Sequence, residues 1–335
     1  MKELLHEICS QKASGLTTTY MEGEIVDRYI NTFITGKCEN VLKTFPAESI
    51  DLILTSPPYA DQRAYGTDES KIHPDDYVDW FIPKAIEFKR VLKRTGSFVL
   101  NINDKVVKGK QHLYVFELVL RLTKEVGFNL VRDYIWYNPS TPPNIFSTGK
   151  YGRTKKSHEY CFWFSKGDRW TFNLDPIRKP YSQDMLRLLK GKGKGDRKHN
   201  TRPSTHSFNC AKAWTNNGGS DPGSVIKLDI LGDPGSVIEV SNTRSNDSFM
   251  KMCKAKRIYH PARFPERLAE FFILSGSNKN DIVLDPFCGS GTTAVSAHRH
   301  GRRWIGIDVN KTYCDLAYER MKLEFSGECD QLGLV

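Results

Sequence analysis

Short apolar runs alternate with amphipathic stretches in the first half of the chain. Residues 48–55 (ESIDLILT) and 97–103 (SFVLNIN) are rich in Ile, Leu and Val, which predicts two buried strands. Between them, residues 75–94 place apolar side chains three and four positions apart, which predicts an amphipathic helix that Gly96 ends. A helix over 115–127 and a strand over 128–137 are expected to follow.

The same alternation returns near the C-terminal end. Residues 265–276 have a helical pattern, DIVLD (281–285) reads as a strand, and a Gly-rich turn leads into a helix that ends at His300. The strand 303–308 and a helix over 311–325 complete the series. Because strands joined through helices form parallel pairs, we predict an α/β fold with a doubly wound, mostly parallel sheet and helices on both faces.

The middle of the chain breaks this pattern and is rich in Gly, Ser, Asn, Lys and Pro. The segment DPGSVI occurs at 221–226 and at 233–238, and each copy reads as a turn and a small strand, the two being paired. Two copies are too few for a solenoid. We therefore expect a small irregular module at 165–257 between two parts of one larger domain, 1–164 and 258–335.

Most of the net charge of +10 lies in this middle region. Residues 150–260 contain 22 Lys and Arg against 10 Asp and Glu, or +12, and the rest contains 27 against 29, or −2. A concentrated basic region indicates a polyanion-binding surface, although a solvated loop without a ligand has the same composition. The plausible phosphate contacts are Lys192, Lys194, Arg197 and Lys198, with a disordered basic loop as the alternative.

Composition excludes several other classes of protein. No run of 18 apolar residues is present and the N-terminal residues do not resemble a secretory signal, so no membrane contact and a cytoplasmic location are expected. The eight cysteines form no CxxC pair. We therefore expect reduced thiols and no metal site.

Residues 281–308 (DIVLDPFCGSGTTAVSAHRHGRRWIGID) form a strand, Gly-rich turn, helix and strand that end in an acid. Gly289 and Gly291 allow a sharp turn and close approach to a ligand, and the helix from Thr292 offers unpaired amides there. Asp308, 17 residues after Gly291, is placed to bind ribose hydroxyls. Asp285 suits a cationic ligand, and S-adenosylmethionine carries an ammonium and a sulfonium.

A second motif, Thr55-Ser56-Pro57-Pro58-Tyr59, stands where the first strand leaves the sheet. An amino group on an aromatic base is a poor nucleophile because its lone pair is conjugated into the ring. The Ser56 hydroxyl and the Pro57 carbonyl can accept its protons and turn the lone pair outward, and Tyr59 offers a face for an unstacked base. A proline-rich turn with a buried tyrosine is the structural alternative.

The pair TSPPY and DPFCGSGTT resembles the DNA amino-methyltransferases of bacterial restriction-modification systems. HPARFPERL (260–268) and KSHEYCFWFSKG (156–167) resemble further family segments. The motif order is similar to that of the permuted beta group, whose intervening module is the target-recognition domain. The resemblance implies a Rossmann-like methyltransferase fold, S-adenosylmethionine as cofactor and double-stranded DNA as partner. It also implies a possible cognate restriction endonuclease.

The resemblance assigns roles to individual residues. Catalysis falls to Ser56, Pro57, Pro58 and Tyr59, and cofactor binding to Asp285, Pro286, Phe287, Cys288, Gly289, Gly291 and Asp308. Serine in the first motif position favours cytosine N4 as the methylated atom, whereas aspartate favours adenine N6. The chain departs from the family at Lys37, where aspartate is usual, and at Asn138, where lysine is common.

Several alternatives stay open at this point. An N6-adenine methyltransferase, an RNA or protein-glutamine methyltransferase, and a non-enzymatic DNA-binding regulator share parts of the pattern. A cytosine C5 methyltransferase is disfavoured because the chain has no Pro-Cys dipeptide to supply its nucleophile. The sequence leaves the recognition site, and the choice between monomer and homodimer, undetermined.

Overall fold

The computed structural model describes residues 26–61, 71–137, 154, 156–190, 216–223, 225–226, 248–256 and 265–326. In this part of the chain an eight-stranded sheet has the order β1-β10-β9-β2-β3-β7-β6-β8, and a small pair, β4-β5, stands apart. The strands are β1 (Thr32–Thr35), β2 (Ile50–Thr55), β3 (Leu92–Ile102), β4 (Val106–Val107), β5 (Lys110–Gln111), β6 (Asn129–Tyr137), β7 (His158–Ser165), β8 (Val225–Ile226), β9 (Ile282–Asp285) and β10 (Arg303–Asp308).

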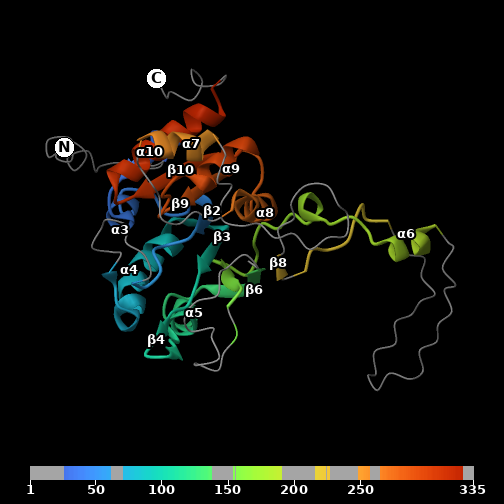
Figure 1. The fold of residues 1–335 in the computed structure, drawn as a ribbon, viewed down its shortest axis with the longest axis horizontal. Coiled ribbons are helices and arrows are strands. Elements are labelled where there is room, and N and C mark those ends of the chain that lie inside the picture. Colours follow the sequence, from blue (N-terminus) through green and yellow to red (C-terminus); the bar gives the residue numbers. More distant parts are fainter. Residues whose placement is uncertain are drawn as a thin grey trace, which may run out of the picture.

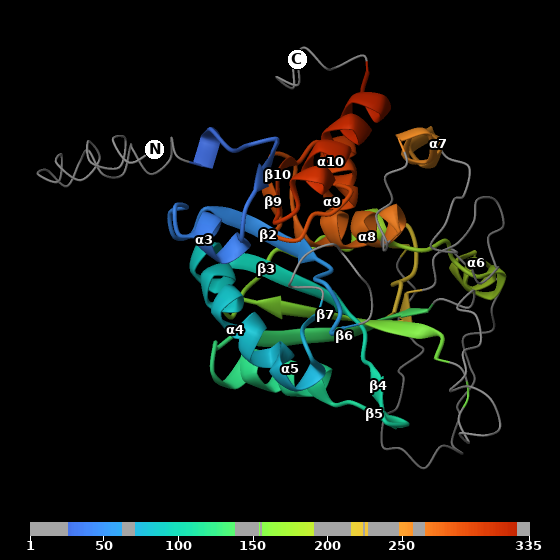
Figure 2. The same cartoon turned by 60° about the vertical axis from the view of Figure 1, so that its left-hand side comes forward.

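Helices cover both faces of the main sheet (Figure 2). The helices are α3 (Cys38–Leu42), α4 (Pro74–Val91), α5 (Tyr114–Lys124), α6 (Gln183–Leu189), α7 (Ser248–Lys256), α8 (Glu266–Gly276), α9 (Thr292–Arg299) and α10 (Lys311–Glu324). One apolar layer joins α4 and α5 to the sheet, with the rings of Phe81 and Phe88 against Phe98 of β3. The other joins α8, α9 and α10 to it and includes Phe272 and Val295. The predicted doubly wound architecture is confirmed.

The sheet is mostly parallel, as predicted, with one exception. Strands β1, β10, β9, β2 and β3 are parallel to their neighbours in that series. Strand β7, which the sequence pattern did not reveal, runs antiparallel between β3 and β6. Its first residues therefore lie at the edge where the parallel strands end.

The order of the strands reverses its direction between β9 and β2. From β9 the chain crosses through α9 to β10 on one side, and from β2 it crosses through α4 to β3 on the other. The two central strands are hydrogen-bonded in parallel, with Leu52 opposite Val283 and Ile53 opposite Leu284. Ligands of open α/β sheets bind beyond the carboxyl ends of strands at such a point.

The predicted end of the helix at 75–94 was wrong. Helix α4 stops at Val91 and the chain enters β3 directly at Leu92. Gly96 does not cap a helix but lies within the strand, where an added Cβ atom would stand 2.9 Å from the Lys93 carbonyl oxygen and 3.1 Å from that of Asp51. This close backbone approach is the physical reason for a glycine there.

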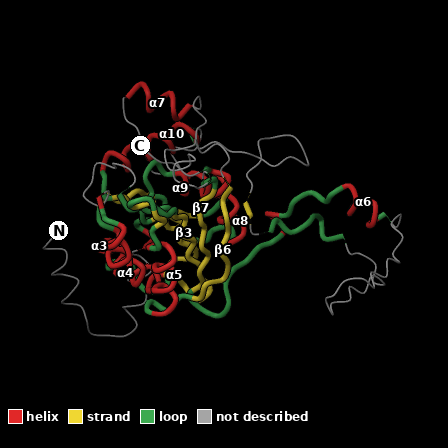
Figure 3. Tube along the Cα trace, turned by 60° about the horizontal axis from the view of Figure 1, so that its bottom comes forward, coloured by secondary structure: helices red, strands yellow, loops and turns green. Residues whose placement is uncertain are grey.

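The described parts of the predicted 165–257 module have no shared apolar core with one another. Strand β8, from the first DPGSVI copy, extends the main sheet by pairing with β6, and the second copy lies outside the described residues. Phe249 and Cys253 of α7 pack against Leu316 of α10. Helix α6 lies well away from the sheet (Figures 1 and 3). The module boundaries therefore stay a prediction.

The membrane prediction concerns helix length and apolar character. Among the described residues, no helix combines the length and the hydropathy that crossing a membrane requires.

Candidate active site

The two sequence motifs meet at the carboxyl ends of β2 and β9. Thr55, the last residue of β2, donates a hydrogen bond from its hydroxyl to Asp285 Oδ1 at 2.6 Å. Thr293 donates to Asp285 Oδ2 at 2.6 Å, and the Phe287 amide donates to Oδ1 at 3.1 Å. Asp285 is 3% exposed, and burial raises its pKa to about 6. This carboxyl group therefore joins the catalytic strand to the Gly-rich turn.

Ser56 and Tyr59 form a polar cluster with Asn101 and Glu159. The Ser56 hydroxyl lies 3.0 Å from Asn101 Oδ1 and 3.2 Å from Tyr59 Oη. Tyr59 Oη lies 2.6 Å from Glu159 Oε2 and 2.9 Å from Asn101 Oδ1. Asn101 comes from the end of β3 and Glu159 from the start of the antiparallel β7, so three neighbouring strands supply the cluster.

The orientation of the Asn101 amide decides how Ser56 can act. Asn101 Nδ2 donates to the Tyr160 carbonyl at 3.2 Å and to Cys161 Sγ at 3.4 Å, so Oδ1 faces the cluster as an acceptor. A Ser56 hydroxyl that donates its single proton to this oxygen keeps its lone pairs for another donor. The geometry therefore prepares Ser56 to accept a proton-bearing group such as a base amino group.

The Gly-rich turn has the backbone shape that its glycines predicted. Gly289 has φ 47° and Gly291 has φ 76°, both in the left-handed region. A Cβ atom on Gly291 would also stand 3.0 Å from Ala317 Cβ and 3.2 Å from Phe33 Cζ. Helix α9 begins immediately after this residue. Its first backbone amides are available to a ligand at the turn.

Asp308 holds the far side of the turn. Its Oδ2 accepts from the Gly289 amide at 2.9 Å and its Oδ1 from the Asn310 amide at 2.8 Å. The Gly36 amide donates to the Asp308 carbonyl at 2.9 Å, which brings the exposed Lys37 to the same strand end. The unusual lysine therefore lies in the turn that follows β1, next to the proposed ribose position.

Aromatic packing connects the turn to helix α4. The Phe287 ring lies 5.8 Å from that of Trp80 and 6.5 Å from that of Phe81. Lys84, 3% exposed, lies 4.2 Å above the Trp80 ring and 3.4 Å from Glu39 Oε1. Aromatic side chains of α4 therefore hold Phe287 in place.

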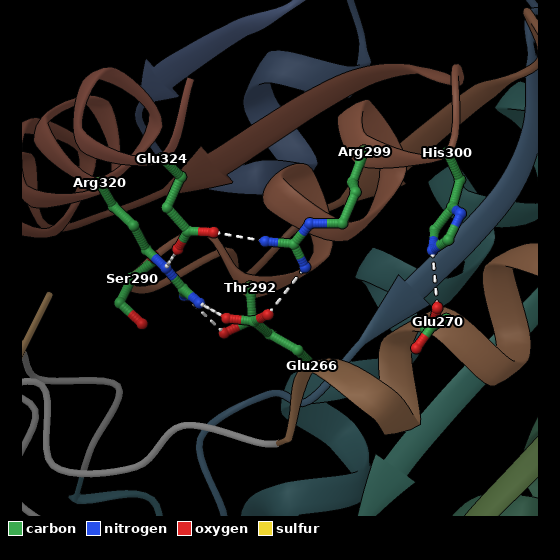
Figure 4. Close-up of polar contacts among 8 residues, drawn as sticks. All are labelled: Glu266, Glu270, Ser290, Thr292, Arg299, His300, Arg320 and Glu324. Atoms are coloured by element: carbon green, nitrogen blue, oxygen red, sulfur yellow. Dashed lines mark hydrogen bonds and ion pairs between the residues drawn. The ribbon is translucent and has the colours of Figure 1, made fainter. Parts of the chain in front are cut away.

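A buried arginine supports the turn from the opposite side (Figure 4). Arg320, 1% exposed, donates to the Ser290 carbonyl at 3.2 Å and to Thr292 Oγ1 at 3.0 Å. It also pairs with Glu266 and, at 2.9 Å, with Glu324. The guanidinium therefore links the Gly-rich turn, which we also call the cofactor turn, to α8 and α10.

The structure brings the two predicted groups of site residues to one edge of the sheet. Pro57, Pro286 and Cys288 are buried, and the Cys288 side chain belongs to the apolar core. Burial raises the pKa of the Cys288 thiol well above its usual value, so the residue offers a ligand its backbone and not a thiolate. The predicted phosphate contacts Lys192, Lys194, Arg197 and Lys198 lie outside the described residues, as does Asn138.

Sequence reasoning missed Asn101, Glu159 and Arg320 as parts of the site. Asn101 ends a predicted strand, and Glu159 stands in a segment that resembles the family, but neither position indicated a partner. Their contacts with Ser56 and Tyr59 span 42 to 100 residues of sequence. Only the pairing of β7 with β3 places the glutamate beside the motif.

The fold and this site define a class of α/β enzyme in which a Gly-rich cofactor turn and a proline-flanked polar cluster meet at a sheet switch point. The chain belongs to the DNA methylase family, whose model matches residues 50–319. The match runs from the start of β2 into α10 and therefore includes both motifs.

Individual relatives agree with this family. The chain is 35% identical over 286 residues to Type II methyltransferase M.PvuII of Proteus hauseri, covering 83% of this chain and 80% of the relative. It is 34% identical to the orphan methyltransferase M.BamHII of Bacillus amyloliquefaciens, covering 82% and 89%. A solved structure described as PvuII DNA methyltransferase (cytosine-N4-specific) matches with a TM-score of 0.63 and 27% identity, over 90% of this chain and 91% of that one.

Proposed function

We propose that the chain transfers a methyl group from S-adenosylmethionine to the exocyclic N4 amino group of cytosine in duplex DNA. The observation that carries the proposal is the 2.6 Å hydrogen bond between Thr55 and Asp285, which sets Ser56 and Pro57 beside the Gly-rich turn. The serine in the first motif position and the cytosine-N4 specificity stated for the PvuII enzyme support this choice of atom.

In this mechanism the protein activates the amino group and the cofactor supplies the methyl. Ser56 Oγ and the Pro57 carbonyl accept the amino protons and direct the nitrogen lone pair towards the turn, while Tyr59 stacks on the flipped base. When bound, S-adenosylmethionine would supply an electrophilic methyl group on its sulfonium, and the sulfur would keep the electrons of the bond that breaks. Gly289, Gly291 and Phe287 would shape its site, and Asp308 would accept hydrogen bonds from its ribose.

The cellular setting follows from the same proposal. The basic region within 165–257 binds the DNA phosphates and reads the target sequence. Methylation protects cytoplasmic DNA from a restriction endonuclease that cuts at the same site. The M.BamHII relative is described as an orphan methyltransferase. A search for an endonuclease gene beside the gene for this chain therefore tests whether the methyltransferase has a cognate endonuclease.

The first experiment identifies the product. Purified protein is incubated with unmethylated DNA and labelled S-adenosylmethionine, and the nucleosides are separated by mass. N4-methylcytosine is expected, N6-methyladenine would overturn the choice of base, and DNA without label would overturn the substrate class.

Ser56→Ala should reduce product formation at least about 100-fold with DNA binding retained, because one of the two amino-group acceptors is lost.

A further inference from the structure

We propose that Glu159 accepts the proton that leaves the target amino group, receiving it through Ser56 and Tyr59. The proposal rests on the proposed function, because it concerns the same transfer. A nitrogen that forms a bond to a methyl carbon becomes positively charged and returns to neutrality when it releases one proton. Glu159 gives that proton a destination inside the protein.

The three side chains form a continuous path. Ser56 Oγ is 3.2 Å from Tyr59 Oη, and Tyr59 Oη is 2.6 Å from Glu159 Oε2. As the amino proton moves to Ser56 Oγ, the serine hydroxyl turns its own proton from Asn101 Oδ1 to Tyr59 Oη, and the tyrosine proton moves to Glu159. Each hydroxyl ends with one proton, as it began, and the carboxylate becomes a neutral acid. Protons and charge therefore balance without another reactant.

Other polar groups near the path are unsuited to this role. Asn101 is an amide, and its oxygen accepts a hydrogen bond but does not take up a proton at neutral pH. Asp285 is enclosed by two threonine hydroxyls and a backbone amide. Asp104 is paired with Lys156 at 2.6 Å. Among the described residues, Glu159 is thus the carboxylate that contacts the Ser56–Tyr59 pair.

The charged and titratable groups around Glu159 do not replace it as the proton acceptor. Lys156, Tyr114 and Cys161 interact with it electrostatically, and Tyr59 donates to it. Burial raises the pKa of Tyr114 and of Cys161, so both stay protonated, and burial lowers the pKa of Lys156, which remains paired with Asp104.

His158 is the nearest rival base on the same strand. Side chains alternate along β7, so His158 and Tyr160 point away from the face that carries Glu159. The His158 and Tyr160 rings lie 5.3 Å apart at 86°, in agreement with that shared face.

The test measures the methyl-transfer step in single-turnover reactions across pH with three variants. Glu159→Gln keeps the size of the side chain and an acceptor for Tyr59 but takes up no proton, and Tyr59→Phe keeps the ring and removes the relay hydroxyl. Each should slow transfer about 100-fold, the usual contribution of a general base, with DNA affinity unchanged. The double variant should be no slower than either single one, because both interrupt one path.

The pH profile separates proton transfer from a structural role. Wild-type transfer should decline towards acid pH as Glu159 becomes protonated, and Glu159→Gln should lack that decline. Glu117→Gln, an exposed carboxylate of α5, is the matched control and should behave as wild type. Infrared difference spectra of wild type minus Glu159→Gln, without cofactor or DNA, should show an ionised carboxylate at the assay pH.

Three results would overturn the proposal: an unchanged rate and acid limb in Glu159→Gln, multiplied losses in the double variant, or a protonated Glu159 at the assay pH. Melting temperatures show whether a slow variant is folded, and Tyr59→Phe provides the test if Glu159→Gln is not. Failure of the proposed function itself has another signature, since the wild type would then form no methylated deoxycytidine.

Discussion

Asp285 shows how one residue serves two motifs. Its carboxyl group accepts hydrogen bonds from Thr55 in the catalytic strand and from Thr293 in the helix after the cofactor turn. Burial raises its pKa from 3.8 to about 6 in spite of these hydrogen bonds. The negative charge is therefore unfavourable in the folded protein relative to the unfolded chain.

This raised pKa predicts a pH-dependent stability difference. The folded state holds the Asp285 proton more tightly than the unfolded chain, so its stabilising effect is complete below pH 4 and is lost as pH rises through about 6. The full loss corresponds to about 3 kcal/mol. Asp285→Asn has no carboxyl proton to lose and gains no buried charge, so its free energy of unfolding should improve relative to wild type between pH 4.5 and 7.5. Urea denaturation at both values checks this, and parallel changes in the two proteins would contradict it.

At the scale of elements, helices α8, α9 and α10 are tied together by charged side chains (Figure 4). Burial by itself would raise the pKa of Glu266, but Arg320 and Arg299 outweigh it and lower that pKa. Arg320 also contacts the Ser290 carbonyl, so the network extends into the cofactor turn. The arrangement joins helix packing to the shape of the ligand site.

Two arginines of this network should differ in their contribution to stability. Arg320→Met removes a buried cation with four hydrogen-bond partners and should cost about 3 kcal/mol, because the buried Ser290 carbonyl and the carboxylates of Glu266 and Glu324 lose that partner. Arg299→Met, at a side chain that is 45% exposed, should cost less than about 1 kcal/mol. Urea denaturation measures both, and calorimetry should show weaker S-adenosylmethionine binding for Arg320→Met. Equal costs would show that burial does not decide the effect.

At the scale of the whole molecule, charge is unevenly distributed. Residues 150–260 carry +12, whereas the remainder carries −2. Helix α6, which belongs to this region, extends away from the sheet that holds the active site (Figure 1). A concentration of positive charge in residues 150–260 is the distribution expected if this region binds the DNA phosphates, as proposed above.

The salt dependence of DNA binding tests this separation. Replacing Lys192, Lys194, Arg197 and Lys198 together with serine should weaken DNA binding. It should also reduce the slope of log affinity against log salt concentration by about 3 to 4, since each lost phosphate contact accounts for about 0.9. Fluorescence anisotropy at several salt concentrations provides the slope. S-adenosylmethionine affinity should stay unchanged, and serine at Lys124 and Lys322, outside this region, should leave the slope as in wild type. An unchanged slope in the fourfold variant would contradict the assignment.

The sequence by itself determined most of the secondary structure and the backbone shape of the Gly-rich turn. Hydrophobic periodicity predicted the strands that became β2, β3, β6, β9 and β10, and the turn glycines predicted the left-handed backbone at Gly289 and Gly291. The two motifs indicated the family, and their order indicated its permuted beta group. These features have short-range physical causes, namely side-chain periodicity and backbone freedom, so a single sequence is enough to predict them.

Tertiary structure alone decided which distant residues share the site. Glu159 reaches Tyr59 because β7 enters the sheet antiparallel to β3, and Arg320 reaches Ser290 because α10 packs behind the turn. No periodicity encodes a contact across 100 residues, since it depends on strand order and direction. The sequence therefore determined the motifs and the class of fold, and the packing of strands and helices decided the proton path and the support of the cofactor turn.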